Sequence, residues 1–112
     1  MFSVATILTV ATVAGDARAE FDQGTTVERI SPGGRYNGIY RVQKGDKVWI
    51  AVSSGGKADI LCAVRDQDKD IFVADGGDSC TLLFTASYSG KYYLGVLNQG
   101  STEAAVVVTA GW

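Results

Sequence analysis

The sequence predicts an all-β fold, either an antiparallel sandwich or a barrel, and three observations support this. Eight short runs rich in β-branched and aromatic residues recur at intervals of about ten residues. Turn-forming residues separate the runs, as in Pro32-Gly33-Gly34 and Asn98-Gln99-Gly100. None of the runs has the 3.6-residue period of an amphipathic helix. With 112 residues, the chain has room for a single domain core.

Each expected strand is bounded by glycine, proline or small polar residues that favour tight turns. In chain order the strands run from Thr25 to Ile30, Tyr36 to Gln43, Lys47 to Ser53, Asp59 to Arg65, Asp70 to Ala74, Cys80 to Ala86, Lys91 to Leu97 and Glu103 to Thr109.

Alternation within these runs predicts which side chains face the core, because successive residues of a strand point to opposite sides of its sheet. The inward rows are expected to be Val48-Ile50-Val52, Ile60-Cys62-Val64, Cys80-Leu82-Phe84 and Tyr92-Leu94-Val96. The opposite rows hold Trp49 and Tyr93. These two rings are our candidates for ligand contact, and Gly95 beside Tyr93 leaves a flat strip that suits a sugar ring or another sheet.

The first nineteen residues are expected to form a signal peptide. Residues 4 to 15 read VATILTVATVAG and carry no charge. This run is too short to span a bilayer, which needs about 20 residues, and Ala17-Arg18-Ala19 has the small-x-small pattern of a signal peptidase site. Cleavage after Ala19 would leave a non-membrane-spanning domain of residues 20–112 in the periplasm or outside the cell. The alternative is a buried N-terminal strand or helix.

Cys62 and Cys80 are the only cysteines, and an even count in an exported domain predicts a disulfide bond. Both fall in inward rows, which agrees with a bond through the core. Their spacing matches neither a CxxC redox pair nor a zinc motif.

The composition argues against an enzyme and against a nucleic-acid partner. The chain has no histidine, which removes Ser-His-Asp and Cys-His catalysis and the usual catalytic zinc sites. It also has no G-x-S-x-G motif. A formal net charge of −2 gives no reason to expect nucleic acid or an anionic membrane as a partner. We therefore expect a non-catalytic protein without a required cofactor.

Four segments together resemble, in order and spacing, the bacterial pre-peptidase C-terminal domain. They read YRVQKGDKV at 40–48, ADILCAVRD at 58–66, CTLLFTA at 80–86 and SGKYYLGVLNQG at 89–100. The sequence departs from the family pattern at Leu61, where the family tends to have a second aspartate. The resemblance implies a jelly-roll-like β-sandwich, here in a small stand-alone exported form. It further implies an accessory or binding module for a polysaccharide or protein of the cell envelope.

Five aspartates could form a weak calcium site. They are Asp66, Asp68, Asp70, Asp75 and Asp78. Alternate carboxylates, as at 66, 68 and 70, begin many calcium loops. However, Ile71 occupies the glycine position of such a loop and Gly77 the position of its bidentate glutamate. We expect weak binding of Ca²⁺ at most, and the alternative is a solvated acidic hairpin.

An excess of cations lies in the first half of the domain. Between residues 29 and 57, Asp46 is the only acidic residue against Arg29, Arg35, Arg41, Lys44, Lys47 and Lys57. Such an imbalance could orient the module toward an acidic polymer. Alternation places only part of the set on one face, so we interpret it as a solvated rim.

A second possible function comes from Ser89-Gly90-Lys91-Tyr92, which matches the short SGxY pattern of periplasmic lysozyme inhibitors. In those proteins the loop enters the cleft of the enzyme. The two functions make opposite demands on Tyr92, which is buried in the sandwich interpretation and displayed on a loop in the inhibitor interpretation.

Overall fold

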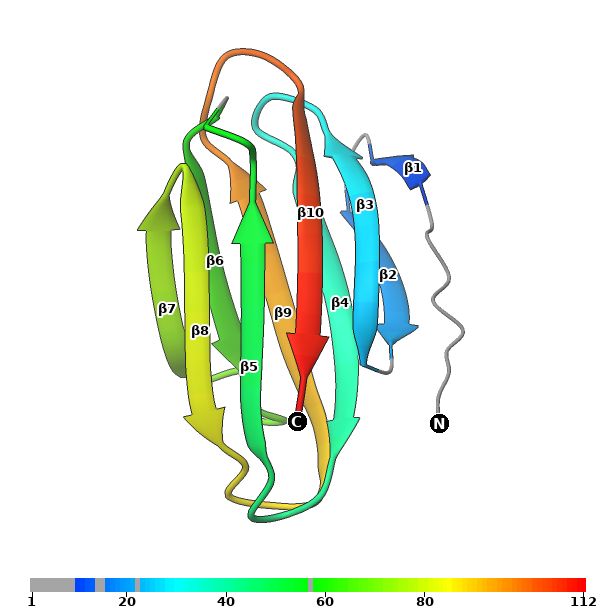
Figure 1. The fold of residues 1–112 in the computed structure, drawn as a ribbon, viewed down its shortest axis with the longest axis vertical. Coiled ribbons are helices and arrows are strands. Elements are labelled where there is room, and N and C mark those ends of the chain that lie inside the picture. Colours follow the sequence, from blue (N-terminus) through cyan, green and yellow to red (C-terminus); the bar gives the residue numbers. More distant parts are fainter. Residues whose placement is uncertain (1–9, 14–15, 22, 57) are drawn as a thin grey trace.

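The computed structural model describes residues 10–13, 16–21, 23–56 and 58–112, with backbone alone for residues 10–13 and 16–21. These residues form ten strands and no helix (Figure 1). In chain order the strands are β1 (Val10–Val13), β2 (Asp16–Phe21), β3 (Gly24–Ile30), β4 (Arg35–Val42), β5 (Lys47–Ser53), β6 (Ile60–Arg65), β7 (Ile71–Gly77), β8 (Ser79–Thr85), β9 (Gly90–Asn98) and β10 (Ala104–Gly111).

The strands form two five-stranded sheets that pack face to face as a sandwich (Figure 1). The front sheet has the order β1-β3-β10-β5-β8, and the back sheet has the order β2-β4-β9-β6-β7. Pairing is antiparallel throughout, except that β1 joins β3 and β2 joins β4 in parallel. The predicted sandwich is thereby confirmed, and the barrel alternative is wrong.

All eight expected strands are present, as β3 to β10, with ends that differ from the expected ones by up to three residues. The largest difference is in β7, which continues through Gly76 and Gly77 where the sequence indicated a turn. Gly77 pairs with Ile60 and has a φ of +128°, a conformation that suits glycine. The chain therefore reverses within a single residue, Asp78, before β8 begins.

The core lies between the sheets and consists of the predicted inward rows. Ile50, Ile60, Leu82, Tyr92 and other members of these rows are almost completely buried. Phe84 is the exception, because it is half-buried near the open end of β8 and packs against the Tyr92 ring at a centroid distance of 5.2 Å. Alternation of side chains thus placed the core correctly.

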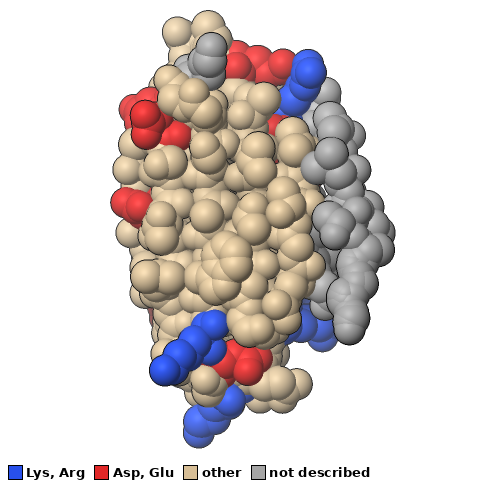
Figure 2. All heavy atoms as spheres, in the orientation of Figure 1, with Lys and Arg blue, Asp and Glu red and all other residues tan. Residues whose placement is uncertain are grey.

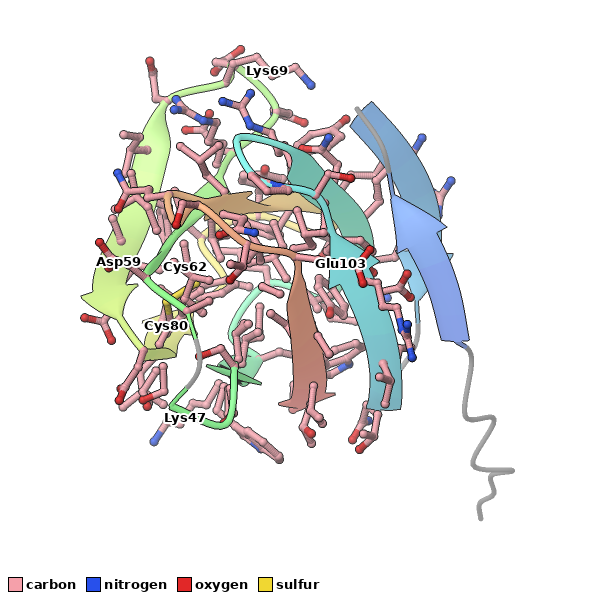
Figure 3. All side chains as sticks on the ribbon, turned by 90° about the horizontal axis from the view of Figure 1, so that it is seen from above. Lys47, Asp59, Cys62, Lys69, Cys80 and Glu103 are labelled. Atoms are coloured by element: carbon pink, nitrogen blue, oxygen red, sulfur yellow. A yellow bond between two sulfur atoms is a disulfide. The ribbon has the colours of Figure 1, made fainter. Side chains whose placement is uncertain are left out.

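The predicted disulfide joins the two sheets. Cys62 lies on β6 in the back sheet and Cys80 on β8 in the front sheet, with their Cα atoms 6.4 Å apart (Figure 3). The bond stands beside the one-residue connection by which the chain leaves the back sheet and enters the front sheet. It therefore fixes this crossover covalently.

The N-terminal segment adds two strands beyond the eight expected ones. Val10–Val13 pairs with Val27 to Ile30 of β3, and Asp16–Phe21 pairs with residues 35–40 of β4. Residues 1–9, 14 and 15 of the expected signal peptide lie outside the described residues. Export and cleavage after Ala19 stay a prediction. No segment described here is a helix long and apolar enough to cross a membrane.

Candidate functional site

The outer side of the front sheet is a broad face almost free of charge, which we call the neutral face. Figure 2 shows it as a continuous uncharged area with acidic and basic groups along its margins. By strand register, its outward positions on β3, β10, β5 and β8 are Thr25, Val27, Ala105, Val107, Thr109, Gly111, Trp49, Ala51, Ser53, Ser79, Thr81, Leu83 and Thr85.

The outward-facing charged residues of the front sheet stand at the ends of this face. Lys47 begins β5 at one end. At the other end Arg29 forms an exposed ion pair with Glu103, with 3.7 Å between the charged atoms. Between these ends the surface offers hydroxyl groups, apolar side chains and one large ring.

Trp49 is that ring, and its indole lies across the backbone of β10. Trp49 is opposite Gly111 in the ladder, and a Cβ on Gly111 would stand only 2.6–2.7 Å from Nε1, Cε2 and Cζ2 of the indole. Only the missing side chain of Gly111 leaves room for the ring. Leu83, the neighbour of Trp49 on β8, is 65% exposed, and Trp49 itself is 43% exposed.

A nearly uncharged surface that presents a flat ring suits an uncharged ligand. No ionic group has to lose its hydration when such a ligand covers the face, so the desolvation cost is small. An indole held against the sheet offers a large rigid contact area at low entropic cost. The threonine and serine hydroxyls around it can both donate and accept hydrogen bonds.

Tyr93, the second predicted contact residue, lies on the other side of the molecule. It belongs to β9 in the back sheet, whereas Trp49 belongs to the front sheet, so the two rings cannot form one site. Tyr93 is half-buried as an outer-face residue, and Lys69 Nζ sits 3.5 Å from the centroid of its ring. Figure 3 shows Lys69 and Lys47 on opposite sides of the sandwich.

The five aspartates of the predicted calcium site fall into two separate groups. Asp66, Asp68 and Asp70 lie in the turn before β7, while Asp75 and Asp78 lie near its far end. Asp70 and Asp75 are five residues apart, which at about 3.3 Å per residue is roughly 16 Å along the strand. A single ion cannot contact both groups, so the combined site is not formed.

Several of these carboxylates have structural partners instead. Asp66 Oδ1 accepts hydrogen bonds from the backbone N–H groups of Asp68 and Asp70, at 2.9 and 3.0 Å. Asp75 accepts from the N–H groups of Thr81 and Gly76, and these bonds hold the pKa of the Asp75 carboxyl below its usual value. In the described part of the chain, no three acidic or cysteine side chains are placed to hold a metal ion.

The Ser89 to Tyr92 segment is held tightly to the body of the protein. Tyr92 is completely buried, and its hydroxyl accepts from the N–H groups of Ser87 and Tyr88 at 2.9 and 3.1 Å. Ser89 Oγ accepts from the N–H of Lys44 at 2.8 Å. Tyr92 therefore anchors the loop from inside and is not displayed, as the sandwich interpretation required.

The burial of one acidic residue was not predicted. Glu28 of β3 points into the sandwich, is 4% exposed, and lies near the buried hydroxyl of Tyr36 on β4. Burial raises the pKa of the Glu28 carboxyl above its ordinary value, and burial likewise raises the pKa of Tyr36 far above its usual range. The alternation Thr26-Glu28-Ile30 was the sequence signal that could have identified it.

Comparison with solved structures shows the same fold in small bacterial β-domains. The pre-peptidase C-terminal domain of a Bacillus anthracis collagenase superposes with a TM-score of 0.71 at 14% identity, over 88% of this chain and 96% of that one. This confirms the predicted resemblance at the level of the fold.

Two further solved structures share this fold. CorA of Methylomicrobium album BG8, a surface-associated copper-binding protein, gives a TM-score of 0.68 at 11% identity over 89% of this chain and 98% of that one. PliG of Aeromonas hydrophila, a periplasmic inhibitor of g-type lysozyme, gives 0.62 at 12% identity over 94% and 98%. No family model matches the sequence. No curated protein matches it either.

Proposed function

We propose that this protein is an exported, non-catalytic binding module that holds an uncharged polysaccharide of the cell envelope on its neutral face. The observation that carries this proposal is the Trp49 indole laid over Gly111 on a surface almost free of charge. A sugar ring has an apolar face that can stack on the indole and hydroxyls that can reach the surrounding threonines and serines.

The comparisons support a binding role in general terms. The similar structures include a pre-peptidase C-terminal domain, a copper-binding surface protein and a lysozyme inhibitor, and none of these descriptions is of a catalytic domain. The disulfide supports an oxidising compartment, as expected for an exported protein.

Binding assays with neutral glycans test the proposal. Affinity electrophoresis in gels containing dextran, a mixed-linkage β-glucan or soluble chitin fragments should show retardation of the protein by at least one of these polymers. We expect Trp49→Ala to weaken that binding about tenfold or more, which corresponds to the loss of one aromatic anchor. Tyr93→Ala is the matched control, because it removes an outer-face ring from the opposite sheet and should bind like the parent.

Gly111→Ala provides a second, independent variant. The added methyl group would clash with the indole, so the Trp49 ring must leave its position while its chemistry stays unchanged. We expect weaker glycan binding and a shift in tryptophan fluorescence at nearly unchanged secondary structure. Equal binding by the parent, Trp49→Ala and Gly111→Ala would contradict the proposal.

Inhibition of lysozyme is the second candidate, favoured by the structural similarity to PliG proteins. The buried position of Tyr92 leaves Ser89 and Lys91 as the parts of the SGxY segment that an enzyme could contact. The test is the lytic activity of a g-type lysozyme with increasing amounts of the protein. Stoichiometric inhibition that disappears in Ser89→Ala/Lys91→Ala would favour this candidate over glycan binding.

A further inference from the structure

The outward residues of the neutral face form straight rows across the front sheet, because partners in neighbouring strands stand side by side at right angles to the strands. The row that contains the indole, which we call the ring row, consists of Gly111, Trp49 and Leu83. The next outward row, which we call the hydroxyl row, consists of Thr25, Thr109, Ala51 and Thr81. The two rows are two residues apart along each strand, which is about 7 Å.

The ring row forms an apolar strip over three strands, β10, β5 and β8. The Trp49 indole covers the β10 backbone at Gly111, and Leu83 continues the strip on β8 with 65% of its surface exposed. The outer two of these strands are about 10 Å apart, since neighbouring strands are spaced by about 4.8 Å. A ligand with an apolar face can therefore contact the strip over that whole length.

The hydroxyl row offers hydrogen-bonding groups beside this strip and crosses four strands, a width of about 14 Å. Thr25 Oγ1 and Thr109 Oγ1 lie 3.2 Å apart and share a hydrogen bond. Because one of these hydroxyls donates to the other, the pair keeps one proton and several lone pairs for a ligand. Thr81, at the other end of the row, is exposed. Ala51 lies between them and adds no bulk that would hold a ligand away from the hydroxyls.

The charged groups of the front sheet indicate on which side of the ring row an uncharged chain lies. Lys47 and Thr85 form the row on one side, so a ligand there would cover an ammonium group. On the other side come the hydroxyl row and then an uncharged row that consists of Val27, Val107, Ser53 and Ser79. Arg29 follows only in the row after that. A neutral chain that leaves these charges hydrated therefore lies on the side of the hydroxyl row.

We propose that the ring row and the hydroxyl row bind a straight, β-linked neutral glycan of the cellulose or chitin type, which lies across the strands. This inference rests on the proposed function and specifies the shape of its ligand. In such chains the equatorial linkages keep the sugar rings flat and in line. Ring faces can then stack on Trp49 and Leu83 while hydroxyls at the edge of the chain reach Thr81. Chains with axial α-linkages curve away from a straight row.

Calorimetry with three hexasaccharides tests the shape of the ligand. Cellohexaose and chitohexaose are straight and β-linked, whereas maltohexaose has the same number of sugars in a curved, α-linked chain. We expect at least one straight hexasaccharide to bind about tenfold or more tightly than maltohexaose, because the curved chain cannot keep both the stacking and the hydroxyl contacts.

Two threonines of β8 provide matched variants, because Thr81 and Thr85 are both exposed and lie on opposite sides of Leu83. Thr81→Val removes a hydroxyl from the hydroxyl row at nearly unchanged size. We expect it to weaken binding of the straight hexasaccharide about fivefold, which corresponds to the loss of one hydrogen bond. Thr85→Val makes the same change on the Lys47 side and should bind like the parent. Valine is favourable in strands, so both variants should fold.

Two outcomes would overturn this inference while the proposed function stands. One is binding of dextran or maltohexaose at least as tight as that of the straight hexasaccharides, with Trp49→Ala weakening it. The other is an equal effect of Thr81→Val and Thr85→Val on the straight hexasaccharide. If no neutral glycan binds, or if Trp49→Ala binds every glycan like the parent, the proposed function fails together with this inference.

Discussion

Tyr92 and Tyr93 are neighbours in the chain, yet the pleat of β9 gives them different surroundings. Tyr92 contacts the rings of Tyr88, Phe84 and Phe72, with centroid distances between 4.4 and 5.8 Å, and its hydroxyl holds the turn before β9. Tyr93 lies on the outer face and has the ammonium group of Lys69 over its ring.

Replacing each tyrosine by alanine should therefore have unequal effects on stability. Tyr92→Ala removes a fully buried ring and should lower the free energy of unfolding by about 3–5 kcal/mol. Tyr93→Ala should lower it by less than about 1 kcal/mol, the range of an exposed cation–π contact. Urea denaturation followed by circular dichroism measures both values. A larger effect at Tyr93 than at Tyr92 would mean that the register of β9 is wrong by one residue.

Glu28 should make stability depend on pH. Its pKa is raised in the folded state, so the folded protein binds the proton more tightly than the unfolded chain does. The contribution is fully present below the ordinary pKa and is lost as the pH rises through the raised folded value. Glu28→Gln, which cannot ionise, should melt at a higher temperature than the parent at neutral pH, and the difference should shrink toward acidic pH.

Thermal melts of both proteins from acidic to neutral pH provide the measurement. Glu103→Gln is the control, because its carboxylate is about half exposed and belongs to a surface ion pair. A difference in melting temperature between the Glu28→Gln variant and the parent that stays constant with pH would contradict this account.

At the scale of elements, the connection between β7 and β8 is the least conventional part of the fold. One residue, Asp78, carries the chain from the back sheet to the front sheet. Its carbonyl accepts from the backbone N–H of Ser54 at 3.1 Å and from the Ser54 hydroxyl at 2.7 Å. The Cys62–Cys80 bond stands beside this connection and limits the separation of the two sheets there.

Removing the disulfide should destabilise the protein by about 3 kcal/mol, since a cross-link over a loop of this length restricts the unfolded chain. Cys62→Ala/Cys80→Ala tests this by denaturation in the absence of reductant. Treating the parent with dithiothreitol should bring its stability to the level of the double variant. If dithiothreitol leaves the stability of the parent unchanged while the double variant is less stable, the lost stability comes from packing rather than from the bond.

The strands were largely predictable because each has its own local signals. Alternating apolar residues identified β5, β6, β8 and β9, and turn residues marked most of their ends. The extension of β7 through Gly76 and Gly77 was not predictable, because glycine pairs there indicate a turn in isolation and become strand only through pairing with β6. Pairing with β6 therefore made this segment a strand, although its local sequence favours a turn.

At the scale of the whole molecule, alternation shows that a residue faces outward but not from which sheet. Trp49 and Tyr93 were both placed outward correctly, and the order β10-β5-β8 against β4-β9-β6 then separates them onto opposite faces. The same order brings Gly111 beneath Trp49, a contact between residues 62 positions apart that no local pattern could reveal. The outward position of Trp49 in the candidate site was therefore predictable from the sequence, but the residues around the ring were not.

Export should produce a protein that begins at Glu20. The uncharged run of residues 4–15 and the Ala17-x-Ala19 pattern predict this cleavage. N-terminal sequencing of the protein from the periplasm or medium of a bacterial host should read Glu20-Phe21-Asp22. An intact Met1 on the protein recovered from that compartment would contradict the predicted cleavage.

The parallel pairing of β1 with β3 and of β2 with β4 gives this cleavage a structural consequence. Residues 10–13 and 16–21 occupy the outer edges of both sheets on the same side of the sandwich. Loss of residues 1–19 would remove all of β1 and most of β2, so the backbone N–H and C=O groups of β3 and β4 would lose these partners. Open edges of this kind accept an added strand. Processing would thus expose the edges of β3 and β4, which could then pair with a segment from another chain.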